Sequence, residues 1–261
     1  MYLVKADHMN LEQIANSGQC FRWRRVKENT YVIPAFHKYL EISQDGDLFT
    51  LSCDEGEWER IWKLYFDFDT DYNEVEQAVM ESNDGFLKAA YQFGRGIRIL
   101  RQDLWEILIS FIISQNNNIP RIKKSIGKIC DETDGRFPDC YEVFDMDLSD
   151  KGLGYRDKYL KAAAAWWMRE GEAATSGFRY TKEIRKHFLE IKGVGNKVAD
   201  CICLFGLHHL EAFPVDTHIR KIMDREYHGE KPDWSASKYA GLLQQYIFYY
   251  ELNCKIKNFS N

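Results

Sequence analysis

The sequence predicts an α+β fold in which an N-terminal antiparallel β-sheet domain is followed by a mainly α-helical domain. Two observations support this prediction. Short β-prone runs separated by turn residues lie in the first part of the chain, whereas apolar residues at helical spacing dominate from Trp58 onward. A glycine-containing junction near residue 95 follows an acidic segment. We therefore expect an N-terminal β-rich domain over residues 1–95 and a helical domain over residues 96–261.

The length and composition indicate a globular protein. With 261 residues, of which 45% are hydrophobic, the chain can bury a full core. The net charge of −5 does not exclude a nucleic-acid partner, because phosphate contacts depend on a local basic face. Basic residues available for such a face, or for an ordinary solvated surface, are Arg121, Lys123, Lys124, Lys128, Arg156, Lys158, Lys161, Arg220 and Lys221.

Cysteine usage and hydropathy bear on the expected compartment. Seven cysteines at irregular spacing do not describe a disulfide framework and fit a reducing environment. No run approaches the roughly 18 consecutive apolar residues of a membrane span, and the amino terminus lacks a signal-peptide pattern. We expect a cytoplasmic monomer, nucleoid-associated if the source is bacterial.

The predicted elements follow from local patterns along the chain. Strands are expected at residues 31–33, 39–42 and 48–51, preceded by a turn with an aromatic anchor at 16–23. Residues 99–112 are apolar on most faces, which is typical of a central core helix. The asparagines at 116–118 compete for backbone hydrogen bonds, so they predict that this helix ends there and another begins.

Residues 184–206 have the pattern of a helix-hairpin-helix. Apolar residues recur at helical spacing on both sides of the turn Lys192–Gly195. The two glycines of the turn allow positive φ and a close approach of the backbone to another surface. The unpaired amides of the second helix, at the positive end of its dipole, suit a phosphate. A tight helix connection without a ligand is the alternative.

Lys197 and Asp216 are candidate catalytic residues. Lys197 lies in the first turn of the second helix, where the dipole disfavours a cation and, with burial, favours the neutral, nucleophilic amine. Asp216 follows nineteen positions later, behind Pro214 and Val215. Taken singly, Lys197 fits a surface lysine and Asp216 an N-cap for a helix beginning at Thr217. Their combination with the hairpin favours catalysis.

Two other segments carry residue types that suit a nucleic acid. In the glycine-containing loop 151–156, Tyr155 has the shape of a wedge for a base step and Arg156 can pair with an acceptor edge. A loop that leads into a helix, with a capping aromatic, is the alternative. In a helix expected near residues 239–250, Gln244 and Phe248 are four positions apart and share one face.

The hairpin, Lys197 and Asp216 together resemble the helix-hairpin-helix DNA glycosylase superfamily. GVGNKVADCICLFGL (193–207) with PVDTH (214–218) is similar to its 8-oxoguanine DNA glycosylase branch. SGQCFRW (17–23), NNNIPRI (116–122) and GLGYR (152–156) are similar to further motifs of that branch. The resemblance runs over nearly the whole chain, with departures at Gln115 and Pro120.

The resemblance implies a role for each matching residue. The expected catalytic residues are Lys197 and Asp216. The residues expected to recognise the damaged base are Gly18, Gln244 and Phe248, with Gln245 leaving a shifted register open. Those expected to fill the duplex gap and contact the estranged cytosine are Asn116, Arg121, Tyr155 and Arg156. Those expected to bind phosphates are Gly193, Gly195, Val198 and His218. Backbone carbonyls expected as ligands of a hairpin cation are those of Leu189, Ile191 and Val194.

The implied activity is excision of 8-oxoguanine opposite cytosine in double-stranded DNA, with a lysine Schiff base and cleavage of the strand by β-elimination. No organic cofactor is implied. An iron–sulfur cluster is not expected, because only Cys254 remains of the four-cysteine cluster that follows the catalytic segment in endonuclease III relatives.

Two rival functions remain. A monofunctional alkyl-base glycosylase would use the same fold with an aspartate-activated water, and Lys197 argues against it. A non-catalytic helix-hairpin-helix DNA-binding protein would bind phosphates better without a carboxylate beside the backbone, so Asp216 argues against it.

Overall fold

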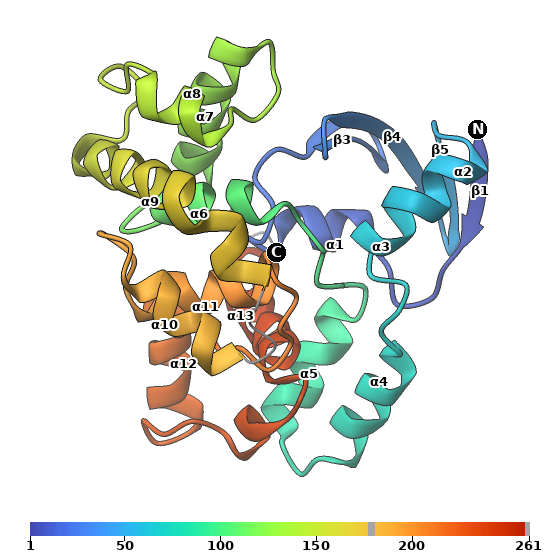
Figure 1. The fold of residues 1–261 in the computed structure, drawn as a ribbon. Helices are drawn as coiled ribbons and strands as arrows, with labels where there is room; N and C mark the ends of the chain where they lie inside the picture. The colour runs from blue at the N-terminus through green and yellow to red at the C-terminus, as the bar shows by residue number, and fades with distance from the viewer. Residues whose placement is uncertain (177–180, 259–261) are drawn as a thin grey trace.

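The computed structural model describes residues 1–176 and 181–258, and the side chains of residues 1–171 and 183–253. An antiparallel sheet lies at one side of the molecule, and a larger group of helices forms the rest (Figure 1). Two hydrophobic clusters of buried residues correspond to these parts. The α+β class predicted from the sequence is confirmed.

The sheet contains five antiparallel strands among the described residues, in the order β1-β5-β4-β3-β2. Its strands are β1 (Tyr2–Lys5), β2 (Arg24–Lys27), β3 (Thr30–Ala35), β4 (Lys38–Asp45) and β5 (Leu48–Leu51). The three expected runs form β3, β4 and β5. β1 and β2 were not expected from the sequence. All of β2 is exposed, so it has no apolar face to indicate it, whereas the short apolar run of residues 2–4 in β1 was missed. One of the two hydrophobic clusters lies against this sheet and is called the N-terminal cluster; it includes Ile33, Leu40 and Leu51.

Short helical segments complete the N-terminal cluster. They are α1 (Leu11–Asn16), α2 (Glu55–Glu57), a π-helical turn (Trp58–Trp62) and α3 (Lys63–Tyr65). Trp58, Trp62 and Phe66 are buried against the sheet. This packing accounts for the large aromatic side chains in this segment.

The helices α4 (Tyr72–Glu81) and α5 (Gly85–Gly94) pack into the second hydrophobic cluster. Val75, Val79 and Leu87 are buried there together with residues of the C-terminal helix. By their packing, residues 72–94 therefore join the helical part, although the sequence pattern grouped residues 1–95 together. Local hydropathy does not reveal which of two cores an amphipathic helix joins.

α6 (Leu104–Ile113) packs against three of the helices that follow it, and its side chains from Ile107 to Ile113 are all buried. The helices that follow α6 make up the rest of this part. They are α7 (Ile119–Cys130), α8 (Cys140–Asp145), α9 (Asp157–Ser176), α10 (Thr181–Leu189), α11 (Asn196–Phe205), α12 (Thr217–Glu226) and α13 (Ala240–Asn258), with short 3-10 turns at Asp131–Thr133, Gly154–Arg156 and Asp233–Ala236. The expected core helix is confirmed, but residues 99–103 lie outside it because Asp103 caps its N-terminus. In the described ranges, no helix combines the length and apolarity that crossing a membrane requires.

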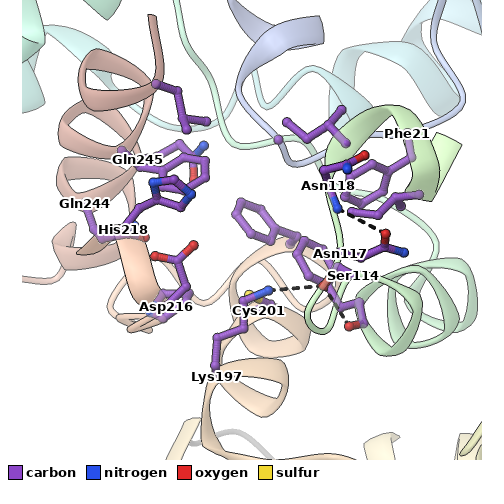
Figure 2. A pocket seen from close by; sticks show the side chains of 18 of the residues that line it. Phe21, Ser114, Asn117, Asn118, Lys197, Cys201, Asp216, His218, Gln244 and Gln245 are labelled. Carbon is purple, nitrogen blue, oxygen red and sulfur yellow. Dashed lines mark hydrogen bonds between the residues drawn. The ribbon is translucent and has the colours of Figure 1, made fainter. Parts of the chain in front are cut away.

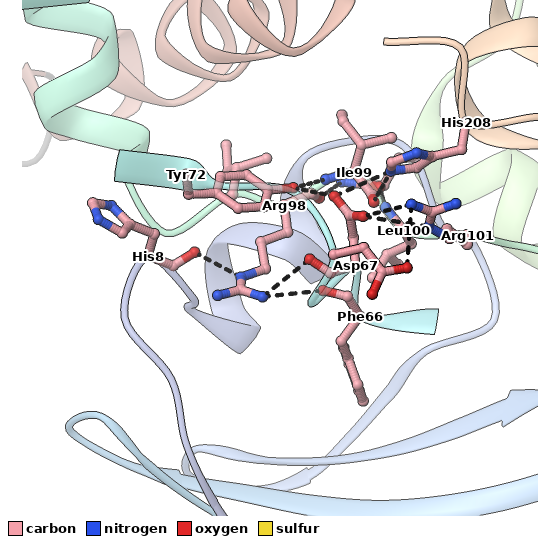
Figure 3. A network of polar contacts seen from close by, with 12 residues as sticks. His8, Phe66, Asp67, Tyr72, Arg98, Ile99, Leu100, Arg101 and His208 are labelled. Carbon is pink, nitrogen blue, oxygen red and sulfur yellow. Dashed lines mark hydrogen bonds and ion pairs between the residues drawn. The ribbon is translucent and has the colours of Figure 1, made fainter. Parts of the chain in front are cut away.

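Arg98 joins the two parts of the molecule (Figure 3). Its buried guanidinium donates hydrogen bonds to the backbone carbonyls of Asp7, His8, Phe66 and Asp67. It also lies over the Phe68 and Tyr72 rings, at 4.5 and 4.9 Å from their centroids. Because a buried cation must be fully hydrogen-bonded, Arg98 fixes these segments against one another.

Asp67 is a buried carboxylate in the same network. It accepts a hydrogen bond from Tyr72 and forms ion pairs with Arg101 and with His208, whose Nε2 is 3.1 Å away. Burial alone would raise the pKa of Asp67. The hydrogen bond and charge of His208, with further hydrogen bonds, outweigh burial and hold the pKa below its ordinary value.

We expect stability to depend on Asp67 at acidic pH. Because its folded pKa lies below the unfolded value of about 3.9, its contribution is present above that pH and is lost as the pH falls through the folded pKa. Asp67→Asn should lower the free energy of unfolding at pH 7 by about 1–3 kcal/mol and flatten the acid limb of a stability–pH curve. Urea unfolding between pH 2 and 7 measures both effects, with the exposed Asp69→Asn as control. If the free energy of unfolding fell equally steeply with decreasing pH in the two variants, the prediction would be wrong.

Candidate active site

The expected helix-hairpin-helix is confirmed as α10, a turn at residues 190–195, and α11. Gly193 has φ +95°, and a Cβ placed on it would lie 2.3 Å from the Tyr159 ring. Gln115 Nε2 donates to the Gly193 carbonyl at 2.9 Å, which ties the turn to the end of α6. These contacts fix the turn, so Gly193 is required for both its conformation and its packing.

Gly195 has a different reason to be a glycine. It is the N-cap of α11, in an extended conformation, and no side chain caps the helix there. A Cβ at this position would meet nothing within 4 Å. The first amides of α11, including that of Val198, are therefore accessible to an anion approaching along the helix axis.

The two glycines give a matched pair of variants. Gly193→Ala should destabilise the fold by about 1–3 kcal/mol, because it strains a left-handed residue and overlaps the Tyr159 ring. Gly195→Ala should leave the melting temperature close to that of wild type, because a Cβ there meets no other atom. If the start of α11 binds a phosphate, as the sequence predicts, the added methyl group should weaken DNA binding. Thermal melts and fluorescence anisotropy with duplex DNA separate the two effects. A folded Gly195→Ala protein with unchanged DNA affinity would argue against phosphate binding here.

Lys197 lies in the first turn of α11 and its side chain is half-buried. Its Nζ donates to Ser114 Oγ at 3.2 Å and lies 4.9 Å from the centroid of the Phe111 ring. Both partners belong to the end of α6. The amine is thus held by a neutral acceptor and an aromatic face, without an ion pair among the described residues.

Asp216 is the N-cap of α12, as expected from the sequence. Its Oδ1 accepts a hydrogen bond from the Ile219 amide at 2.8 Å. This bond fixes the carboxylate in a direction set by the helix. Figure 2 shows the Asp216 and Lys197 side chains turned toward the same cavity.

The cavity has a volume of about 360 Å³ and brings together six of the predicted residues. These are Gly18, Lys197, Asp216, His218, Gln244 and Phe248. They come from the segment before β2, from α11 and α12, and from α13, which are far apart in the sequence. A largely apolar cavity with few polar groups is typical of a small-ligand site.

Gly18 and Phe248 form one wall of this cavity. Gly18 has φ +82°, and a Cβ there would lie 3.2 Å from the Phe248 ring. The Phe248 ring also meets His218 edge-on, with centroids 6.0 Å apart. Gly18 therefore allows the backbone to approach an aromatic face that is available for stacking.

The two adjacent glutamines of α13 have different environments. Gln245 Nε2 donates to the Ser17 carbonyl, which attaches α13 to the Gly18 segment. Both glutamines line the cavity, but within the described part of the chain the side-chain amide of Gln244 forms no hydrogen bond. Gln244 is therefore the glutamine whose amide is available to a ligand.

A second hollow, of about 460 Å³, adjoins the cavity and shares Lys197, Asp216 and His218 with it. Its further walls include Asn116, Gly195, Val198 and Arg220. The amides at the start of α11 and the cavity mouth therefore lie on one continuous surface.

The loops 114–118 and 152–156 face each other beside this surface. Asn116 has φ +46°, and its Nδ2 is 3.5 Å from the Tyr155 hydroxyl. Arg121 Nη2 is 3.4 Å from the Gly152 carbonyl. Asn116, Arg121 and Tyr155 are exposed, so their side chains are accessible from solvent. Pro120 lies in the first turn of α7, a position where proline is compatible with a helix.

Arg156 differs from these residues because it is only 4% exposed. Its guanidinium donates to the carbonyls of Gln115, Asn116 and Leu153 and packs on the Tyr155 ring at 4.6 Å. In this structure it holds the Asn116 loop, and contact with a base would require it to exchange these carbonyls.

Sequence reasoning missed several cavity residues. Phe111 and Ser114 contact the Lys197 amine, and Cys201 lies one turn after Lys197 on the same helix face. Burial raises the pKa of the Cys201 thiol to about 11, although Lys197 lowers it. The i, i+4 spacing from Lys197 to Cys201 was an available signal, whereas nothing local marks Phe111 or Ser114.

Known proteins are similar to this chain in sequence and in fold. The family model of the 8-oxoguanine DNA glycosylase N-terminal domain matches residues 1–108. The N-glycosylase/DNA lyase of Saccharomyces cerevisiae is 36% identical over 265 residues, which cover 86% of this chain and 70% of the yeast protein. This chain belongs to the N-glycosylase/DNA lyase family.

Further members of the N-glycosylase/DNA lyase family agree. The N-glycosylase/DNA lyase of Arabidopsis thaliana is 30% identical over 90% of this chain and 75% of its own length. The Clostridium acetobutylicum 8-oxoguanine glycosylase/lyase, solved in complex with double-stranded DNA containing cytosine opposite 8-oxoguanine, matches with a TM-score of 0.87 and 32% identity. The match covers 98% of this chain and 99% of the clostridial one.

Metal-binding groups were also expected at the hairpin. In the described ranges, no three His, Cys, Asp or Glu side chains are placed to hold a metal ion. Cys254 falls outside the side chains that the structure describes. At the hairpin, the Ile191 carbonyl accepts a hydrogen bond from the Val194 amide at 2.9 Å, which closes the turn.

Proposed function

We propose that this member of the N-glycosylase/DNA lyase family excises 8-oxoguanine opposite cytosine from double-stranded DNA and then cleaves the strand. The observation that carries the proposal is one cavity that holds Lys197 and Asp216 beside Gly18, Gln244 and Phe248. The relatives named above support the same substrate. The catalysis needs no organic cofactor, because lysine supplies the covalent chemistry.

Excision requires the damaged nucleotide to leave the duplex, at a cost of about a few kcal/mol. The exposed Tyr155 is proposed as the wedge in the base step, and Asn116, 3.5 Å from its hydroxyl, as the residue that fills the gap. Arg121 is proposed to contact the estranged cytosine. Arg156 is proposed to contact the same cytosine once its guanidinium has released the loop carbonyls to which it now donates hydrogen bonds.

The cavity is proposed to recognise the extruded base by its edge and its face. The Gly18 carbonyl accepts from the N7–H that 8-oxoguanine has and guanine lacks. Guanine would instead place a lone pair against that carbonyl. The free Gln244 amide meets the Watson–Crick edge, and the Phe248 ring stacks on the base.

The chemistry begins with the neutral amine of Lys197. A bond forms between Nζ and C1′ as the bond from C1′ to the base breaks, and the departing base takes up a proton. Asp216 stabilises the positive charge that develops on the sugar. Opening of the sugar gives a protonated imine, with loss of one amine proton and protonation of the ring oxygen. The protonated imine makes the proton on C2′ acidic. When that proton is lost, the 3′ phosphate leaves and the strand is cleaved.

The backbone of the DNA is proposed to lie on the second hollow. The amides of Gly195 and Val198, the Gly193 turn and the exposed His218 contact phosphates. The carbonyls of Leu189, Ile191 and Val194 are proposed to hold a cation, since hard cations prefer oxygen ligands. A difference in DNA affinity between potassium and N-methylglucamine buffers of equal ionic strength tests that cation.

Borohydride trapping tests the proposed function. A duplex with one 8-oxoguanine opposite cytosine should give a covalent adduct with the protein, whereas an undamaged duplex should not. Release of the base without an adduct would favour a monofunctional glycosylase. Binding without reaction, on this or on alkylated DNA, would favour a non-catalytic DNA-binding protein.

The adjacent glutamines of α13 test the proposed base recognition. Gln244→Ala should lower kcat/KM on 8-oxoguanine by about 10-fold to 100-fold, because a polar edge of the base loses its partner. Its melting temperature should not change. Gln245→Ala should instead lower the free energy of unfolding by about 1–3 kcal/mol, because it leaves the buried Ser17 carbonyl unpaired. If Gln245→Ala lost activity and Gln244→Ala lost stability instead, Gln245 would be the glutamine that faces the base.

A further inference from the structure

The Lys197 amine contacts Ser114 and Phe111 at the end of α6. Figure 2 shows its hydrogen bond with Ser114. Ser114 is the C-cap of α6, and its hydroxyl donates to the Phe111 carbonyl at 2.8 Å. The same oxygen accepts from Lys197 Nζ at 3.2 Å. Ser114 therefore connects the catalytic amine directly to the backbone of the central helix.

The direction of these hydrogen bonds determines what the amine can do. A hydroxyl has one proton, and in Ser114 the Phe111 carbonyl holds it. Ser114 can then only accept from Lys197. Were the hydroxyl free to turn, it could donate to the lone pair of the neutral amine and block the atom that must attack C1′. The observed arrangement directs an N–H toward Ser114 and leaves the lone pair for the cavity.

The Phe111 ring limits the amine from a second side. The ring centroid is 4.9 Å from Nζ, and the ring stacks on Phe205 with centroids 5.2 Å apart and an interplanar angle of 10°. Phe111 and Ser114 are three positions apart, so the end of α6 presents them on one face. A ring held by stacking gives the amine a fixed support.

We propose that Ser114 is a positioning residue that orients the Lys197 amine for attack, by acting as an obligatory hydrogen-bond acceptor. This inference rests on the proposed function, since it assigns Lys197 the nucleophilic step. It predicts that loss of the hydroxyl slows covalent bond formation without weakening DNA binding.

The test compares Ser114→Ala and Ser114→Thr with wild type in single-turnover borohydride trapping. Ser114→Ala should form the adduct roughly 10-fold to 100-fold more slowly, because the amine is no longer aligned. Its DNA affinity should be unchanged. Ser114→Thr, which keeps a hydroxyl, should recover most of the rate.

Ser110→Ala is the matched control, because Ser110 is buried in the same helix and does not line the cavity. It should trap at the wild-type rate. Wild-type trapping kinetics in Ser114→Ala would overturn the inference. So would a Ser114→Thr variant as slow as Ser114→Ala, which would assign the loss to the shape of the cavity and not to the hydroxyl. If wild type itself formed no adduct, the proposed function would fail instead.

Discussion

Lys197→Gln is expected to abolish adduct formation and strand cleavage on the 8-oxoguanine duplex, with a loss of at least about 10³-fold in rate. The amide has no nucleophilic lone pair, so neither the bond to C1′ nor the imine can form. The fold should tolerate the change, because the glutamine amide can still donate to Ser114, which now accepts from Lys197 at 3.2 Å. One gel that separates the trapped adduct from the cleaved strand measures both products.

Lys192→Gln is the control for charge at the hairpin. Lys192 is exposed in the turn and does not line the cavity. Its replacement removes the same charge near the DNA, so it should alter affinity at low salt but leave trapping at saturating protein intact. Covalent trapping that persisted in Lys197→Gln would mean that another amine is the nucleophile.

Asp216→Asn is expected to slow base release by on the order of 10²–10³-fold, because the charge that stabilises the developing cation on the sugar is lost. Asparagine is as good an N-cap as aspartate, so the bond to the Ile219 amide should persist and the melting temperature should stay near that of wild type. Single-turnover base release, read by alkaline cleavage of the product, measures the effect.

Asp216→Ala separates the two roles of this residue. Alanine removes both the charge and the cap, so it should show the same loss of rate and, in addition, about 0.5–2 kcal/mol of lost stability. If Asp216→Asn released the base as fast as wild type while Asp216→Ala was slow, the carboxylate would matter only as a helix cap.

The sequence predicted most strongly where the pattern is local. The hairpin and the helix start at Thr217 depend on glycine conformation and on capping within a few residues, and the structure has both. The exposed strand β2 had no such pattern, so the sequence did not predict it. The packing of α4 and α5 against the helical part was also not evident, because their amphipathic faces fit either core.

The candidate site shows the same division. Lys197 and Asp216 were identifiable because residue type and helix position together indicate chemistry. The choice between Gln244 and Gln245 was open, because adjacent positions on one helix differ only in direction. Both side chains line the cavity, and the tertiary contacts attach Gln245, not Gln244, to the Ser17 carbonyl.

By itself, the sequence determined the class of fold, the turn of the hairpin and the identity of the two candidate catalytic side chains, because these follow from interactions between near neighbours in the chain. Only the tertiary structure decided that Ser114 and Phe111 hold the lysine amine and that Arg156 is committed to the Asn116 loop. Those contacts join segments about 40 to 80 residues apart, and their geometry depends on how α6, α9 and α11 pack around one core.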